Sequence, residues 1–201
     1  MRLTALALNC TLKSGGDESS TDVLLQQLLD ALAELDVGGE IVRVADHDVR
    51  PGVTSDEGDG DAWPALRKQV LAADILVLGT PIWLGKPSSI CHRVLERMDA
   101  FLGEEDDQGR MISYDRVGVV VTVGNEDGAH HVAAELYQAL VDVGYTVPAS
   151  AQTYWVGEAM QGTEYKDLDS PPEAVASQTK LVATNAAHLA RLLKKNPYPP
   201  S

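Results

Sequence analysis

Hydroxyl side chains and one lysine cluster in the polar segment 9–22, which follows a short apolar run and precedes a stretch with helical periodicity. An anion can bind at a helix N-terminus, because unpaired N–H groups and the positive end of the helix dipole meet there. The alternative is that Ser20, Thr21 or Asp22 only caps the helix. The candidate phosphate ligands in this segment are Thr11, Lys13, Ser19, Ser20 and Thr21.

Two features limit the kind of nucleotide site that this segment can form. It contains neither GxGxxG nor GxxxxGK[ST], so a Rossmann dinucleotide site and a P-loop are not supported. Acidic residues also outnumber the lysine locally, because Asp17, Glu18 and Asp22 stand against Lys13. A bound phosphate must therefore depend on N–H and hydroxyl donors.

A second candidate loop, residues 79–89, reads GTPIWLGKPSS and follows a continuous apolar run. Proline and glycine give a loop of defined shape whose backbone can approach a flat ligand, and tryptophan offers a face for stacking. The alternative is a turn in which Trp83 packs on a neighbouring helix. The residues expected to surround a ring are Pro81, Ile82, Trp83, Leu84, Gly85 and Lys86.

A third candidate loop follows the next apolar run and opens a helix. Its ligand-type residues are Thr122, Gly124, Asn125 and Gly128, and the alternative is a plain turn with Asp127 as a cap. We expect no metal here, because the adjacent residues His130 and His131 would point about 100° apart on a helix. Further on, the Tyr154-Trp155 pair could close over a ring, line a subunit contact or pack in the core.

These loops separate segments that alternate between strand and helix patterns, which predicts an α/β fold with a parallel sheet and helices on both faces. Ligands in such sheets bind outside the carboxyl ends of the strands. Gly38-Gly39 is expected to end the first helix. The predicted strands are 3–8, 40–45, 74–79, 116–123 and 145–148, and the predicted helices are 20–35, 63–73, 90–102, 129–143 and 173–195.

The length of 201 residues and the hydrophobic share of 44% predict one domain over 1–201. Residues 149–172 read as a long irregular segment, and 196–201 as a flexible tail. The core must be aliphatic, because Phe101 is the single phenylalanine.

The net charge of −14 argues against nucleic acid and anionic membrane surfaces as partners. No apolar run reaches about 18 residues, and the first ten residues lack the pattern of a signal peptide. The two cysteines, Cys10 and Cys91, have no metal-ligand spacing. We therefore expect a cytoplasmic protein with reduced thiols.

The strand and helix order, the 9–22 loop and the segment TPIWLGKPSS at 80–89 resemble the NADPH-dependent FMN reductase-like flavoproteins of the flavodoxin-like superfamily. The NAD(P)H:quinone reductases are near relatives of that family. The resemblance covers about residues 1–150, and 80–89 is its most specific part. Asn9-Cys10-Thr11-Leu12 replaces the usual G-S-x-R start of the phosphate loop, so the phosphate contacts are less defined by the match.

The resemblance implies a three-layer sandwich with strand order 2-1-3-4-5 and FMN as cofactor. The 9–21 candidates would hold its phosphate, the 81–86 candidates would frame the isoalloxazine ring, and the 122–128 candidates would contact the far edge. Hydride would pass from NADPH or NADH through FMN to a quinone, a free flavin or a similar small acceptor. The flavin carries this chemistry, so no catalytic side chain is required. Relatives of this kind commonly form homodimers or homotetramers.

Two other functions remain open from the sequence. One is a flavodoxin-type electron carrier whose acidic surface docks basic partners, which the charge of −14 favours. The other is an FMN-free binding domain that kept the fold. The long 149–172 segment and the acidic 103–114 connection favour an enzyme, because extra segments over a site can gate small substrates.

Overall fold

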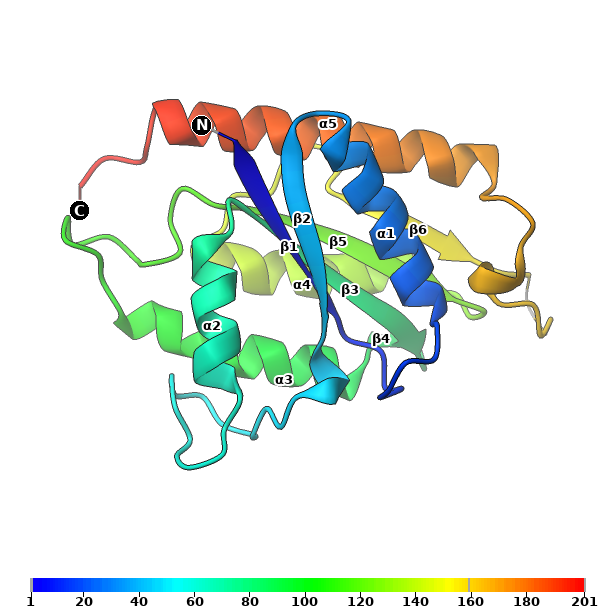
Figure 1. The fold of residues 1–201 in the computed structure, drawn as a ribbon, viewed down its shortest axis with the longest axis horizontal. Coiled ribbons are helices and arrows are strands. Elements are labelled where there is room, and N and C mark those ends of the chain that lie inside the picture. The colour runs from blue at the N-terminus through cyan, green and yellow to red at the C-terminus, as the bar shows by residue number, and fades with distance from the viewer. Residues whose placement is uncertain (1, 159, 201) are drawn as a thin grey trace.

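A twisted parallel sheet forms the centre of the computed structural model, which describes residues 2–158 and 160–200 (Figure 1). The strand order is β2-β1-β3-β5-β6, and a short extra strand, β4, pairs antiparallel with β3. With β4 set aside, this is the predicted order 2-1-3-4-5, which is thus confirmed. The strands are β1 Leu3–Asn9, β2 Val37–Arg43, β3 Ile75–Trp83, β4 Lys86–Pro87, β5 Val117–Gly124 and β6 Gln152–Val156.

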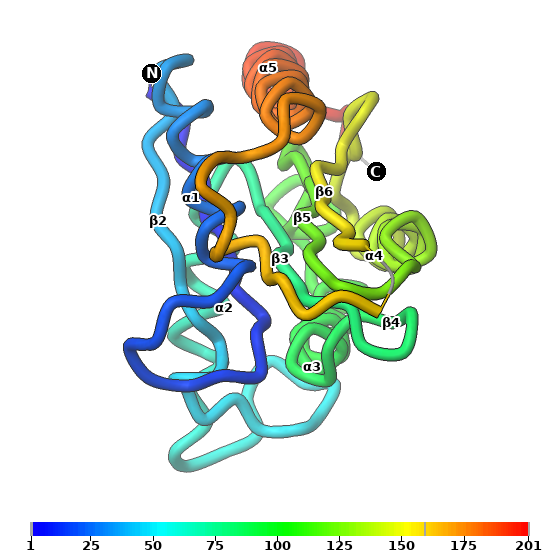
Figure 2. Tube along the Cα trace, turned by 90° about the vertical axis from the view of Figure 1, so that its right-hand side faces the viewer, coloured from blue at the N-terminus to red at the C-terminus, as the bar shows by residue number. Residues whose placement is uncertain are grey.

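Helices cover both faces of this sheet, which gives the predicted three layers (Figures 1 and 2). Helices α1 and α5 bury Leu28 and Val182 against strand residues such as Val77, whereas α2, α3 and α4 pack on the opposite face. The helices are α1 Ser20–Ala33, α2 Trp63–Ala72, α3 Ser89–Met98, α4 Ala129–Asp142 and α5 Glu173–Lys195, with short 3-10 turns η1 Val44–Asp46, η2 Asp99–Gly103 and η3 Tyr165–Asp167.

The central strands are apolar on both sides because each layer of helices needs its own apolar surface. In β5, Val119 and Val121 face α1 and α5, whereas Val120 faces the other layer. Alternate residues of one strand therefore belong to two separate cores. This explains why the continuous apolar runs at 74–79 and 116–123 predict central strands correctly.

Some predicted boundaries are wrong. Gly38-Gly39 does not end the first helix but lies inside β2, since Asp36 adopts the left-handed conformation (φ 59°) and reverses the chain earlier. The prediction of strand 40–45 therefore starts too late. A Cβ on Gly39 would lie 2.8 Å from the Leu29 side chain, so α1 packs closely on this strand.

The last strand was predicted at 145–148, but the sheet ends with β6 at Gln152–Val156. Thr146 makes only an isolated bridge with Val117. The prediction fails because β6 is an edge strand of polar and aromatic residues, which lacks the apolar run of a central strand. Part of the segment 149–172, predicted to be irregular, thus extends the sheet beside β5.

The predicted flexible tail contains one well-anchored residue, Tyr198. Its N–H donates to Asp115 at 2.8 Å, its carbonyl accepts from Arg110 at 2.8 Å, and its ring lies 5.4 Å from that of Tyr114. Arg110 also pairs with Asp106. These contacts hold the chain end against the connection between α3 and β5.

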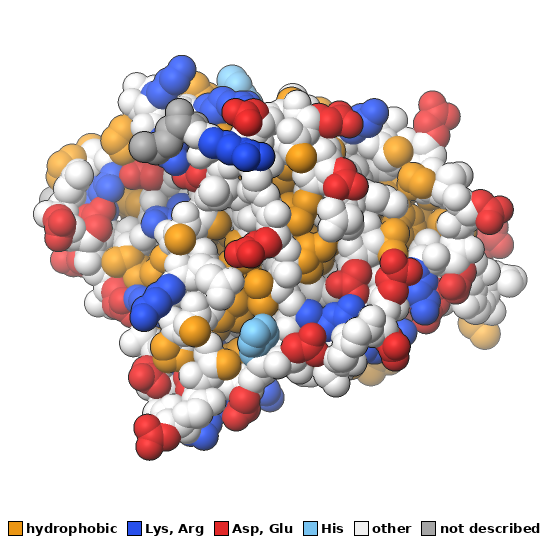
Figure 3. Space-filling model, viewed as in Figure 1, with side chains coloured by type: hydrophobic (Ala, Val, Ile, Leu, Met, Phe, Trp, Pro, Cys, Tyr) orange, Lys and Arg blue, Asp and Glu red, His pale blue; other side chains and the backbone are white. Residues whose placement is uncertain are grey.

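Charged side chains of both signs are mixed over the face shown in Figure 3, without a continuous basic area on that face. Among the described residues, no helix has the length and apolar character that crossing a membrane requires.

A fully buried ion pair holds the long Asp- and Gly-rich loop between β2 and α2 on α3. Arg97 on α3 lies 2.8 Å from Asp61, and both side chains are 0% exposed. Arg97 also donates to the carbonyls of Arg50 at 2.9 Å and Thr54 at 3.1 Å. Every charge that the loop buries here is therefore matched by a partner.

The environment of Asp61 favours its charged form. Burial by itself raises the pKa, but hydrogen bonds from the Glu57 N–H, the Arg97 guanidinium and the Trp63 N–H outweigh it and lower the pKa to about 2. The contribution of this carboxylate to stability is present above its unfolded pKa of about 3.9. It is lost as the pH falls toward the folded value of about 2.

We expect Arg97→Met to lower the free energy of unfolding by about 3–5 kcal/mol, because it leaves Asp61 buried without a counter-charge. Urea denaturation measures the change. The matched control is Lys194→Met, which breaks the partly exposed pair with Asp74 and should cost at most about 1 kcal/mol. Equal losses in the two variants would show that the buried pair has no special role.

Candidate functional site

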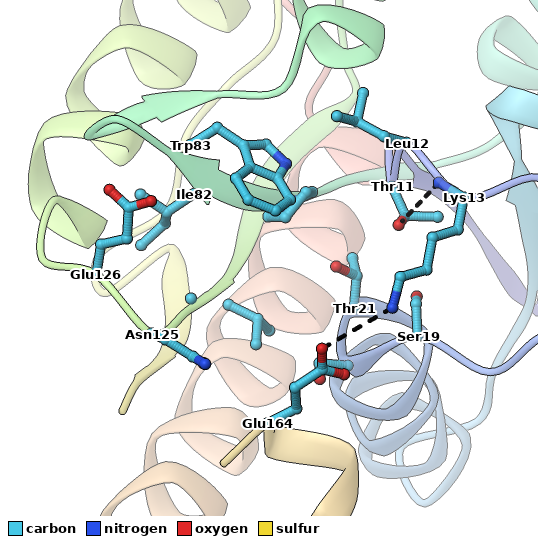
Figure 4. Close-up of a pocket in the computed structure, with 14 residues that line it drawn as sticks. Thr11, Leu12, Lys13, Ser19, Thr21, Ile82, Trp83, Asn125, Glu126 and Glu164 are labelled. Carbon is cyan, nitrogen blue, oxygen red and sulfur yellow. Dashed lines mark hydrogen bonds and ion pairs between the residues drawn. The ribbon is translucent and has the colours of Figure 1, made fainter. Parts of the chain in front are cut away.

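A pocket opens at the carboxyl edge of the sheet, where loops from separate parts of the chain converge (Figure 4). It lies beside the point where β1 has neighbours on both sides and the strand order reverses, as expected for ligand sites in such sheets. The cavity encloses about 190 Å³. Its lining consists of Thr11, Leu12, Lys13, Ser19, Ser20, Thr21, Pro81, Ile82, Trp83, Val123, Gly124, Asn125, Glu126 and Glu164.

The N-terminus of α1 forms one end of the pocket, and Ser19 is its cap. The Ser19 hydroxyl accepts from the Asp22 N–H at 3.1 Å, and Asp22 accepts from the Ser19 N–H at 3.0 Å. The cap is thus Ser19, whereas the sequence suggested Ser20, Thr21 or Asp22. The N–H groups of Ser20 and Thr21 have no partner within the helix, so they can meet an anion in the pocket.

The acidic residue at this end is neutralised by groups from two strands. Asp22 accepts from Asn9 at the end of β1 and pairs with Arg43 at the end of β2. Arg43 was not among the predicted site residues, because it lies 21 positions beyond Asp22 in the sequence, outside the loop. Because Asp22 is paired in this way, its charge repels a phosphate at the helix terminus less than the acidic local composition indicates.

A tight hairpin forms the opposite wall of the pocket. Trp83 pairs with Lys86 across a two-residue turn in which Leu84 (φ 51°) and Gly85 (φ 74°) are both left-handed. This geometry follows the strand twist and places Trp83 beside the cavity, with 52% of its surface exposed. The segment 81–86 is therefore a strand end and hairpin, whereas the sequence predicted a loop.

The hairpin rests on the loop that follows β5. Gly128 has φ 127°, and a Cβ added there would lie 2.9 Å from the Gly85 Cα. Lys86 extends away from the cavity and pairs with Glu135 on α4, with His131 2.8 Å from its ammonium group. The pKa of Glu135 is lowered, first by its hydrogen bond from Lys86.

The structure gathers most of the predicted ligand residues at the cavity and places some outside its lining. Leu84 is 91% exposed at the hairpin tip, and Gly85 and Lys86 contact the α4 side. Thr122 is buried and accepts from Gln152 at 2.9 Å, and Gly128 packs on the hairpin backbone. Lining residues that the sequence reasoning did not name are Leu12, Val123, Glu126 and Glu164.

Glu164 belongs to a segment, residues 160–168, that we call the strap. Figure 2 shows the chain after β6 crossing the carboxyl edge of the sheet toward the start of α1. Within the strap, the Tyr165 hydroxyl donates to Gln27 at 2.6 Å and the Lys166 N–H donates to Ser20 at 3.3 Å. The Trp155 and Tyr165 rings also lie 5.5 Å apart.

The histidines and cysteines near this edge are engaged in packing. His130 meets the Tyr154 ring edge-on at 5.2 Å, and His131 faces Lys86, so the two histidines point to different neighbours. Within the described residues, no group of three or more His, Cys, Asp or Glu side chains could hold a metal ion. A hydrogen bond with Cys91, together with burial, raises the pKa of the Cys10 thiol well above its usual value.

The sheet order and the pocket at its switch point define an α/β protein of the flavodoxin-like class. Solved structures of flavodoxins at 8% and 14% identity share this fold, with TM-scores of 0.59 and 0.62. Those likenesses concern the fold alone.

Relatives of higher identity cover almost the whole chain. The 8-demethyl-8-aminoriboflavin-5'-phosphate synthase of Streptomyces davaonensis is 34% identical, over 98% of this chain and 81% of that protein. The crystal structure of RosB with a bound 8-demethyl-8-formylriboflavin-5'-phosphate intermediate gives a TM-score of 0.88 at 34% identity, covering 98% of this chain and 82% of that one. A Mycobacterium bovis protein described as the divalent metal cation transporter MntH is 38% identical over 96% of this chain, which spans 29% of that protein.

The sequence model of the NADPH-dependent FMN reductase family matches residues 3–161. The chain therefore belongs to the NADPH-dependent FMN reductase family, as its sequence motifs indicated. It is a flavin-dependent enzyme of the oxidoreductase type.

We expect Gly128→Ala to destabilise the protein more than Gly58→Ala. Both glycines have positive φ (127° and 92°), but a Cβ on Gly58 meets nothing within 4 Å. Gly58→Ala should cost about 1 kcal/mol from backbone strain. Gly128→Ala should cost about 1–3 kcal/mol more, because its Cβ displaces the hairpin backbone. Chemical denaturation compares the two, and equal costs would mean that the hairpin moves freely.

Proposed function

We propose that the pocket holds FMN and that the enzyme uses it to pass hydride from NADPH or NADH to a quinone, a free flavin or a similar small acceptor. One observation carries the proposal: a single cavity joins an anion-binding helix terminus to an aromatic wall. Helix N–H groups, hydroxyls and Lys13 suit the phosphate at one end, and Trp83 suits the ring at the other (Figure 4).

The size of the cavity indicates how FMN fits. Sites that enclose such a ligand completely measure about 300–1,000 Å³, and this cavity encloses about 190 Å³. The phosphate end is the enclosed part, since Thr11, Ser19 and Thr21 are each buried. Trp83, which is half exposed, would then contact the ring near the mouth of the cavity, where a second substrate can reach it.

When bound, FMN supplies the hydride chemistry, and the chain supplies binding and orientation. Ser20, Thr21 and Lys13 would hold the phosphate, while Ile82 and Trp83 would contact the ring. Asn125 at the far side offers an amide that can donate to a ring oxygen or accept from a ring N–H. We propose no catalytic side chain: the cysteines are buried, and the described lining residues contain no histidine.

The alternative is a flavodoxin-type carrier without its own NAD(P)H-dependent turnover. A carrier exposes its flavin edge to another protein, whereas here the strap crosses the carboxyl edge of the sheet (Figure 2), bonds to Ser20 and adds Glu164 to the cavity lining. This arrangement supports an enzyme that admits small molecules.

The relatives favour a second candidate for the substrate. RosB was crystallised with a riboflavin-5'-phosphate derivative, and a curated relative is named as a synthase of another such derivative. A phosphorylated flavin could thus be the substrate that this enzyme converts, in the same pocket, instead of a resident cofactor. Recovery of the flavin unchanged after many turnovers supports the cofactor role.

We also propose that the enzyme is a homodimer or homotetramer. Three apolar side chains near the mouth are exposed: Leu12 by 50%, Trp83 by 52% and Leu84 by 91%. A second subunit over this rim would cover the part of the ring that the pocket leaves open. Light scattering of the purified protein tests the oligomeric state.

We expect the protein to bind FMN and Trp83→Ala to weaken that binding by about tenfold, through loss of the stacking face. Fluorescence titration measures both affinities. Leu102→Ala is the matched control, since Leu102 is an apolar side chain as exposed as Trp83 (53% against 52%) but lies on η2, outside the cavity lining. If the two variants bind FMN equally well, the ring does not lie on this wall.

We expect the FMN-loaded enzyme to oxidise NADPH or NADH continuously once a quinone or free flavin is added. Steady-state absorbance at the reduced nicotinamide band measures the rate, with and without acceptor. The control is free FMN at the same concentration, which lacks the oriented pocket. FMN binding without turnover on any acceptor would support the carrier.

A further inference from the structure

The phosphate end of the pocket already contains an anion of its own, the carboxylate of Glu164 on the strap (Figure 4). Its Oε1 lies 3.9 Å from the ammonium group of Lys13, and its Oε2 lies 3.4 Å from that of Lys166. The side chain of Glu164 is 40% exposed. Lys13 is thus drawn to a carboxylate at the place where the proposed function needs it for a phosphate.

The strap holds Glu164 at this place through contacts of the two residues that follow it. The next residue, Tyr165, is 2% exposed and bonds to Gln27 on α1. Lys166 donates its N–H to Ser20, one of the proposed phosphate ligands. These contacts keep the backbone of Glu164 beside the helix terminus, while its partly exposed side chain can still rotate away from Lys13.

Other carboxylates near the cavity do not compete for Lys13 in this way. Asp22 is paired with Arg43 and takes part in the helix cap. Glu126 lines the same cavity but at the far side, beside Ile82 (Figure 4). Glu164 is the acidic lining residue that meets the phosphate-binding lysine.

A flavin phosphate carries a charge of about −1.5 to −2 at pH 7. Two anions at the same lysine repel each other, so the phosphate must displace Glu164 from Lys13 or share the lysine with it. Riboflavin, which lacks the phosphate, meets no such competition. The carboxylate thus reduces the gain in binding affinity that the phosphate group would otherwise give FMN over riboflavin.

We propose that Glu164 is a specificity-determining residue: it occupies Lys13 in place of the phosphate and thereby limits the preference of the site for phosphorylated over non-phosphorylated flavins. This inference rests on the proposed function. It assigns Glu164 to the phosphate end of the ligand, where its removal helps binding, and not to the ribityl chain, where its removal would harm binding.

The test compares the affinities of FMN and riboflavin for the wild type, Glu164→Gln and Glu126→Gln, measured by quenching of flavin fluorescence. We expect Glu164→Gln to tighten FMN binding by about three- to tenfold and to leave riboflavin binding unchanged. Glu126→Gln removes the same charge from the same cavity and should leave the FMN-to-riboflavin ratio unchanged. Lys13→Met should abolish the effect of Glu164→Gln.

Three outcomes overturn the inference. Weaker binding of both flavins in Glu164→Gln would place the carboxylate on the ribityl chain or in the anchoring of the strap. If Glu164→Gln and Glu126→Gln tighten FMN binding equally, the effect comes from the overall charge of the cavity and not from the position of Glu164. If Glu164→Gln still tightens FMN binding in the Lys13→Met variant, Glu164 does not act through Lys13. Failure of the wild type to bind either flavin would instead overturn the proposed function itself.

Discussion

The whole site depends on a constraint of parallel sheets: every strand ends at the same edge, and the loops must leave from there. Because β2 and β3 lie on opposite sides of β1, the loops after β1 and β3 turn toward different faces and leave a crevice between them. Thr11 enters this crevice from one side and Trp83 from the other. The two ends of the candidate ligand site therefore come from segments about 70 residues apart in the chain.

Charge pairing makes this crevice usable by an anion in a protein with a net charge of −14. Arg43 and Asn9 take up Asp22, which would otherwise stand in the first turn of α1 facing the site. Lys13 faces the cavity and meets Glu164 across it. The balance of positive and negative charge at this edge thus depends on residues from β1, β2 and the strap. It cannot be read from the local composition of any one loop.

The sequence was sufficient for the fold and for the edge of the sheet at which the candidate pocket lies. The apolar runs at β3 and β5 and the helix periods predicted the alternation of strands and helices, and the family resemblance supplied the strand order. The ligand-type loops predicted the edge at which the pocket lies. It was insufficient where tertiary contacts override local pattern, as in β6, whose edge position requires no apolar run. Thr122 and Lys86 have the chemistry of ligands, yet burial beneath Gln152 and pairing with Glu135 direct them elsewhere. Glu164 gave no local signal, because its role arises from the path of the strap.

The contact between Gly85 and Gly128 has a mechanical consequence. Backbone touches backbone there, without a side chain that could change rotamer to absorb a shift. The tryptophan hairpin and the first turn of α4 therefore move as one rigid piece, tied again by Lys86 and Glu135. Adaptation of the mouth to ligands of different size must then come from the opposite side of the cavity, where the strap rests on α1 by a few hydrogen bonds.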